Sequence, residues 1–208
     1  MDNVFGYTLG SGFGDMWIFA NNLAILSGEL PEVRFNPVSL SHSLEESRPR
    51  YLGLITEILD CLDFNGREKI IPVYDPPTIA HFRYKNLYLR TKIKYTGESN
   101  YIVYQENATS EKPPAHIMKT FYDCLEMYKK KFEFIQLGKH MSVAKNIEVT
   151  SKAKAFIGFD SGMIHLCLGV GIPCYLTRLS WFFGGHTYGV SIVPSVEDMF
   201  KKACELIH

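Results

Sequence analysis

A group of small polar residues follows a run of apolar residues in the C-terminal half of the chain. The sequence predicts a buried strand at 155–159, a polar turn at 160–162, a short apolar helix at 163–170 and a further strand from 172. Strand, tight turn, helix and strand form a βαβ unit, which builds parallel sheets. Ligands of such sheets lie outside the carboxyl ends of the strands, where helix N-termini point. The sequence therefore predicts a ligand site at Asp160–His165.

The residue types of this turn suit the binding of a phosphate group. A helix N-terminus offers backbone N–H groups and partial positive charge to an anion. Gly162 lets the backbone approach a ligand closely, Ser161 adds a hydroxyl donor, and His165 adds a positive or neutral donor. In the competing interpretation Asp160 is only a helix N-cap and His165 only a packed side chain.

A second glycine-rich turn follows the first predicted strand, Val4–Leu9. Its spacing from Gly10 to Gly14 is G-x-G-x-G, and Asp15 stands where the third glycine of a dinucleotide-binding fingerprint belongs. The acid expected near the end of the second strand is also missing, because Arg34–Pro37 stands there. The chain has no GK[ST] sequence of a P-loop either. These departures argue against an NAD enzyme and against a P-loop nucleotidase.

The overall charge is balanced, with 22 Lys and Arg residues against 22 Asp and Glu residues. A dedicated nucleic-acid binder usually carries an excess of positive charge, so this class is disfavoured. Nucleic-acid binding is kept as an alternative because of one local feature. This is the basic face of a predicted strand at 86–95, which carries Arg90, Lys92 and Lys94. The seven histidines show no metal-ligand spacing, and we expect no metal site.

The distribution of cysteines and apolar residues indicates the compartment. The five cysteines are dispersed and form no CxxC pair, which suggests a reducing environment. The N-terminus has no basic region followed by an apolar run, as a signal peptide requires. No apolar stretch approaches the roughly 20 residues of a membrane span. We therefore expect a cytoplasmic protein without a membrane span.

Predicted strands and helices alternate along the whole chain, which indicates α/β architecture. Helices are expected at 16–26, 51–62, 115–131, 142–152, 163–170 and 196–207, and strands at 4–9, 33–35, 69–74, 86–95, 101–104, 132–137 and 155–159. Ser195 is expected to cap the last helix. The turn at 97–100 is the predicted domain boundary, which divides the chain into 1–97 and 98–208.

Taken together, the two polar turns resemble those of glycosyltransferases of the family-nine, heptosyltransferase-like group, in a shortened form. Gly12-Phe13-Gly14-Asp15 is similar to that family's small-x-Gly-Asp turn after the first strand. Residues 156–165 resemble its strand leading into D-S-G-x-x-H, and residues 169–173 resemble the continuation of small residues and proline. Residues 108–112 resemble the loop that carries a phosphate-binding lysine.

The resemblance implies a GT-B-like fold, in which two small Rossmann-like domains face each other across a cleft. The domain at 1–97 is then the acceptor side, and the domain at 98–208 binds the nucleotide-sugar. By the same resemblance, Asp15 is the catalytic base on an acceptor-side loop that includes Gly12 and Gly14. The donor-binding residues it implies are Lys112, Asp160, Ser161, Gly162 and His165.

The predicted function is the metal-independent transfer of a sugar from a nucleotide-diphosphate donor to a hydroxyl acceptor of unknown class. No cofactor is expected beyond this donor substrate. The alternative is a non-catalytic nucleotide- or sugar-binding module of the same fold. The aromatic loop at 181–186 either covers the nucleotide base or belongs to the core. Since small two-domain enzymes often pair, a homo-oligomer is also open.

Overall fold

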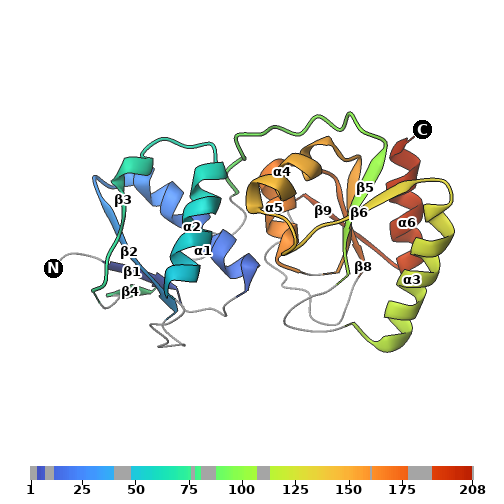
Figure 1. Cartoon of the computed structure of the whole chain (residues 1–208), viewed down its shortest axis with the longest axis horizontal. Coiled ribbons are helices and arrows are strands. Elements are labelled where there is room, and N and C mark those ends of the chain that lie inside the picture. Colours follow the sequence, from blue (N-terminus) through green and yellow to red (C-terminus); the bar gives the residue numbers. More distant parts are fainter. Residues whose placement is uncertain are drawn as a thin grey trace. The chain divides into compact units, whose positions relative to one another are not determined.

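The computed structural model describes residues 4–7, 12–39, 48–75, 78–80, 88–106, 113–159, 161–177 and 189–207. The chain divides into two compact units, Met1–Lys92 and Ile93–His208, and each has its own parallel sheet (Figure 1). The predicted α/β class with two parallel-sheet domains is confirmed. The division lies close to the boundary predicted at 97/98. The roles of acceptor and donor domain, and their facing across a cleft, stay predictions.

The N-terminal unit is a four-stranded sheet in the order β3-β2-β1-β4, with every neighbouring pair parallel. Its strands are β1 (Val4–Tyr7), β2 (Val33–Ser39), β3 (Ile70–Pro72) and β4 (Ile79–Ala80). Its helices are α1 (Phe13–Glu29), α2 (Arg48–Cys61) and the 3-10 turn η2 (Arg67–Lys69). The two α-helices pack against each other and against β2.

Helix α1 is the centre of the N-terminal core. Its apolar residues lie on all sides, as is usual for a helix covered by other elements. Trp17 is fully buried, and the ring of Phe19 meets that of Phe35 on β2 edge-on, with 6.0 Å between centroids. Buried Asn21 accepts a hydrogen bond at its Oδ1 from the Leu89 backbone N–H at 2.9 Å. That bond ties the segment after the sheet to the helix.

The C-terminal unit is a five-stranded parallel sheet in the order β6-β5-β7-β8-β9. Its strands are β5 (Tyr101–Gln105), β6 (Glu133–Gln136), β7 (Ala155–Gly158), β8 (Cys174–Thr177) and β9 (Val190–Val193). Its helices are α3 (Ala115–Lys129), α4 (Val143–Lys152), α5 (Met163–Val170) and α6 (Val196–Cys204), followed by the 3-10 turn η3 (Glu205–Ile207). Helices α3 and α6 pack together on one side, and α4 and α5 on the other (Figure 1).

An aromatic cluster fills the space between this sheet and helices α3 and α6. Phe121 on α3 lies at its centre, 5.3 Å from the ring of Phe159 and 5.2 Å from the ring of Phe200. The alternating residues Ile102 and Tyr104 of β5 enter the same cluster, because successive side chains of a strand point to opposite faces. This core fixes β5 and β7 against α3 and α6.

Two sequence expectations about strands are wrong. The strand expected at 33–35 does not stop there, because β2 runs past Pro37 to Ser39. The proline lies where the pairing of β1 with β2 shifts register, and a bulge is a position where a strand tolerates proline. The expected strand at 86–95 is also absent from the described residues 88–95, where Thr91 forms an isolated bridge with Leu62.

Segment 90–99 instead bonds to the ends of two helices. The Lys92 N–H donates to the carbonyl of Cys61 at the end of α2, at 2.8 Å, and the Thr96 N–H donates to that of Ser151 near the end of α4, at 2.8 Å. The Lys92 Nζ donates to the Asp60 carbonyl at 2.7 Å, so this lysine does not belong to a basic strand face. None of the helices in the described part of the chain is long and apolar enough to cross a membrane.

Candidate functional site

The topology of the C-terminal sheet locates the candidate ligand site. From β5 the chain moves outward to β6 and then returns to β7 on the opposite side of β5. The direction of winding therefore reverses between β5 and β7. In open α/β sheets, ligands bind outside the carboxyl ends of the strands at such a reversal. The segments that leave these two strands begin at Glu106 and Phe159, so Phe159, Ser161 and Gly162 border this point.

The paired ends of β5 and β7 leave no room for a side chain at residue 158. Gln105 pairs with Gly158, and a Cβ added to Gly158 would lie only 2.5 Å from the Gln105 carbonyl oxygen and 3.2 Å from the Phe156 ring. Real Cβ atoms do not come this close to a backbone oxygen. Glycine at 158 is therefore a requirement of the packing, and it brings the two strand ends together at the reversal.

The turn after β7 leads directly into the N-terminus of α5. The Ile164 N–H donates to the Ser161 carbonyl at 3.1 Å, and every residue of α5 is buried. The helix ends at Gly171, which has the left-handed φ of 87° and donates its N–H to the Cys167 carbonyl at 2.8 Å. No acidic residue stands in its first turn. The partial positive charge of this helix end is therefore not offset by a carboxylate of its own first turn.

Ser161 contributes an unusual group to this turn. It is 8% exposed, and its Oγ makes no hydrogen bond within the part of the chain that the structure describes. A buried hydroxyl without a partner costs about 1–3 kcal/mol. Such a group at a helix N-terminus suits a ligand whose oxygen atoms supply the missing partner.

The other predicted donor-binding residues lie partly within the described chain. Gly162 precedes α5 with φ −56° and ψ −26°, an ordinary right-handed conformation. His165 is the third residue of α5, is 8% exposed, and already interacts with another group of the protein. Lys112, Asp160 and the aromatic loop at 181–186 lie outside the described residues. The structure thus brings Ser161, Gly162 and His165 together at one helix end.

Some polar residues at this edge were missed by the sequence analysis. Glu106 follows β5 directly, and its carboxylate accepts a hydrogen bond from the Tyr122 hydroxyl of α3. Desolvation by burial raises the pKa of that hydroxyl, and the Glu106 charge raises it further. Thr177 ends β8 and is buried. An isolated acid after a strand, or a threonine within one, carries no sequence signal that separates it from an ordinary loop or strand residue.

Asp15 lies near the corresponding point of the N-terminal sheet. The strand order there reverses between β1 and β4, and α1 follows β1. Gly12 caps α1 with an extended backbone, φ −77° and ψ 158°, and Gly14 is buried in the first turn. Both glycines therefore belong to the start of the helix. Asp15 is the acid of that first turn, half-buried and in contact with another group, where a carboxylate also stabilises the helix dipole.

The described residues contain no group of three or more His, Cys, Asp and Glu side chains that could hold a metal ion. The N-terminal unit does contain one more buried donor without a hydrogen-bond partner among its described residues, the Trp17 Nε1 of α1.

No family model and no curated protein matches the sequence. Solved structures do share its fold. The Escherichia coli ADP-heptose LPS heptosyltransferase II superposes with a TM-score of 0.54 at 10% identity, over 99% of this chain and 98% of that chain. The E. coli heptosyltransferase WaaC with ADP gives 0.51 at 12% identity, over 99% of each chain. A family 9 glycosyltransferase from Veillonella parvula gives 0.51 at 12% identity, over 100% of this chain and 98% of that chain. The predicted resemblance to these enzymes is thereby confirmed at the level of the fold.

Proposed function

We propose that this protein is a glycosyltransferase that takes a sugar from a nucleotide-diphosphate donor and passes it to a hydroxyl acceptor. The proposal is supported by the fold that the chain shares with heptosyltransferases and by the position of Ser161 and Gly162 after β7, at the reversal of the C-terminal sheet. The observation that carries it is the buried Ser161 Oγ, which makes no hydrogen bond in the described chain.

In this proposal the C-terminal unit binds the diphosphate of the donor. The N-terminus of α5 supplies backbone N–H groups and partial positive charge, and the Ser161 hydroxyl donates to a phosphate oxygen. His165 and Lys112 donate to the same diphosphate. These groups stabilise the negative charge that grows on the diphosphate when the bond to the sugar breaks.

Asp15 is the general base of the proposed reaction. Its carboxylate takes the proton of the acceptor hydroxyl, the acceptor oxygen bonds to the anomeric carbon of the sugar, and the bond from that carbon to the diphosphate oxygen breaks. The diphosphate leaves with the electron pair of that bond. No metal takes part in the proposed reaction, because Lys112 and the helix end offset the charge of the leaving group. Addition of EDTA should accordingly leave turnover unchanged.

The donor site can be tested by calorimetry with ADP, UDP, GDP and CDP. ADP comes first because one structure of the same fold was solved with it. We expect selective binding of one diphosphate, and Ser161→Ala should weaken it about tenfold or more, since a hydrogen bond to a charged group is worth about 1.5–3 kcal/mol.

Thr150→Val is the matched control for this substitution. Thr150 on α4 is fully buried, and its Oγ1 also makes no hydrogen bond within the described chain. Both substitutions remove a buried hydroxyl from the same unit, but we expect only Ser161→Ala to change binding. Equal affinities of all three proteins for every diphosphate, or no binding by any of them, would contradict the proposed donor site.

The role of Asp15 separates the transferase from a non-catalytic binding module. Asp15→Asn keeps the size of the side chain but removes its basicity. With a substrate pair that turns over, this variant should lose turnover by at least a hundredfold and keep the affinity for the diphosphate. If this variant kept native turnover, Asp15 would not be the general base, and its role would be limited to stabilising the first turn of α1.

A further inference from the structure

The loop that leaves β6, residues 137–142, is held rigidly by one buried side chain. Asn146 of α4 is 2% exposed. Its Oδ1 accepts from the Gly138 N–H at 3.1 Å, and its Nδ2 donates to the carbonyls of Gly138, Met141 and Ser142 at 3.0, 3.2 and 3.0 Å. The Met141 N–H closes the turn onto the Gly138 carbonyl at 3.2 Å. The backbone of this loop is therefore fixed without help from a ligand.

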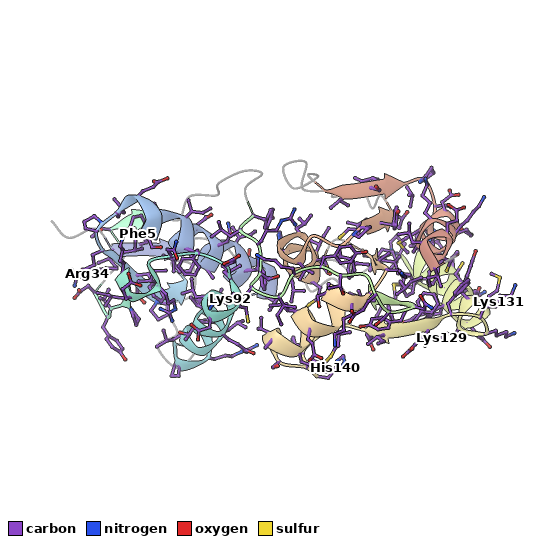
Figure 2. All side chains as sticks on the ribbon, turned by 90° about the horizontal axis from the view of Figure 1, so that it is seen from above. Phe5, Arg34, Lys92, Lys129, Lys131 and His140 are labelled. Carbon is purple, nitrogen blue, oxygen red and sulfur yellow. The ribbon has the colours of Figure 1, made fainter. Side chains whose placement is uncertain are left out.

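Two cationic or potentially cationic side chains project from this fixed loop. Lys139 and His140 are both exposed, and neither forms a hydrogen bond or ion pair with any described residue. His140 lies next to the start of α4 (Figure 2). The loop contains no Asp or Glu, so no acid on it can neutralise Lys139 and His140.

The loop lies on the same edge of the sheet as Ser161. Strand β6 pairs with β5, and β5 pairs with β7, all in parallel. Neighbouring strands are about 4.8 Å apart, so the end of β6 is about 10 Å from the end of β7. A nucleotide with its diphosphate at Ser161 can span this distance with its ribose. In Rossmann-type sheets, an acid after the second strand binds the ribose 2′-hydroxyl, and an arginine nearby accommodates a 2′-phosphate.

Strand β6 is the second strand of the C-terminal unit, and it is followed by basic residues instead of an acid. We propose, on the basis of the function proposed above, that Lys139 and His140 recognise a phosphate on the 2′ or 3′ position of the ribose of the donor nucleotide. The substrate class is then a nucleoside diphosphate sugar with a third phosphate on its ribose. Lys139 binds it as a fixed positive charge, and His140 donates a ring N–H.

The test compares three probes on the full-length protein by calorimetry: ADP, ADP with a 2′-phosphate and ADP with a 3′-phosphate. The two phosphorylated probes distinguish the two ribose positions. We expect one of them to bind at least tenfold more tightly than ADP, with an advantage that shrinks as salt is raised, because exposed charges are screened. Lys139→Glu should abolish this advantage and leave the affinity for ADP within twofold.

Lys130→Ala is the matched control. Lys130 is an exposed lysine of the same unit, but it follows α3 at the amino edge of the sheet. It should change none of the three affinities. His140→Gln, which keeps a neutral N–H donor, should reduce the advantage of the phosphorylated probe without abolishing it.

The possible results separate this inference from the proposed function. If ADP binds through Ser161 but neither added phosphate improves affinity, the inference is wrong and the donor site stands. If Lys139→Glu weakens ADP as much as the phosphorylated probes, Lys139 contacts the diphosphate, and the inference is also wrong. If none of the three probes binds and the other diphosphates fail as well, the proposed function and the inference that rests on it are both overturned.

Discussion

Gly158 shows how one residue sets the geometry of the candidate donor site. Because glycine has no Cβ, the Gln105 carbonyl oxygen can lie where it would be only 2.5 Å from a Cβ of residue 158. Gly158→Ala should therefore force the ends of β5 and β7 apart and lower the free energy of unfolding by about 3 kcal/mol, the upper end for overpacking. Denaturant unfolding measures this change.

Gly53 provides the control for that substitution. It lies on the exposed side of α2, and a Cβ added there would meet nothing within 4 Å. Gly53→Ala should raise the free energy of unfolding by about 0.5–1 kcal/mol, because alanine has less backbone entropy to lose in a helix. A Gly158→Ala protein as stable as the native one would show that β5 and β7 separate at little cost.

The buried thiol of Cys204 should make the free energy of unfolding of the C-terminal unit depend on pH in alkaline solution. Burial in the aromatic core raises the pKa of its thiol from 9.0 to about 11. Because the folded protein holds the proton more tightly than the unfolded chain, stability is complete below pH 9 and falls as the pH rises towards 11. The loss attributable to Cys204 reaches about 2 kcal/mol by pH 11.

The measurement is the slope of the free energy of unfolding against pH. Cys204→Ala lowers the absolute stability through a small cavity at every pH, but it should flatten the slope between pH 9 and pH 11. An unchanged slope would mean that other buried groups cause the alkaline loss; burial also raises the pKa of the Cys124 thiol in the same core.

At the scale of elements, Asn146 ties the loop after β6 to α4 with four side-chain hydrogen bonds. Asn146→Leu should cost about 3 kcal/mol or more, since it leaves several backbone groups of a buried turn without partners. Because the same loop carries Lys139 and His140, the variant should also lose the preference for a ribose phosphate. Urea unfolding and calorimetry measure the two effects.

A substitution at the N-cap of α4 distinguishes a loss of helix stability from a loss of the loop structure. The Ser142 Oγ accepts from the Lys145 N–H at 3.1 Å, and Ser142→Ala should cost about 1 kcal/mol without changing nucleotide preference. If Asn146→Leu were no more destabilising than Ser142→Ala, the loop would not depend on the buried amide.

Elements with a strong local pattern could be predicted from the sequence, and elements defined by their partners could not. The apolar stripe of α3 and the Ser195 cap of α6, whose Oγ accepts from the Asp198 N–H at 3.0 Å, follow from local spacing. Strands β4 and β9 are short and were not predicted. The alternation at 86–95 was misleading, because an exposed connection can alternate without pairing.

The candidate site also has features that the sequence predicts and features that only the folded structure shows. Ser161 and Gly162 could be placed between β7 and α5 because strand, turn and helix follow each other directly in the sequence. The close contact of Gly158 with Gln105, and the lack of a partner for the Ser161 hydroxyl, depend on residues far apart in the chain. No single-sequence pattern reports such distances, so these two features appear only in the folded structure.

The segment that connects the two units forms hydrogen bonds with the C-terminal unit from residue 95 onward. Residues 95–97 belong to the C-terminal unit through their hydrogen bonds. The Tyr95 hydroxyl donates to the Lys154 carbonyl at 3.2 Å. The backbone N–H groups of Thr96 and Gly97 donate to the Ser151 carbonyl at 2.8 and 3.2 Å. These bonds place the boundary before residue 95, and the contacts divide the chain between Lys92 and Ile93.

Two fragments test that boundary. We expect fragment 93–208 to unfold cooperatively in urea, because it has its own sheet and aromatic core. Fragment 98–208, cut at the boundary that the sequence predicts, lacks the bonds of Tyr95, Thr96 and Gly97 and should be less stable by about 2 kcal/mol. Gly97→Ala should cause part of this loss in the full chain, since φ is +60° and a Cβ there would lie 2.6 Å from the Tyr95 hydroxyl oxygen. Equal stability of the two fragments would mean that these bonds do not stabilise the unit, and that the boundary at 97/98 is the better description.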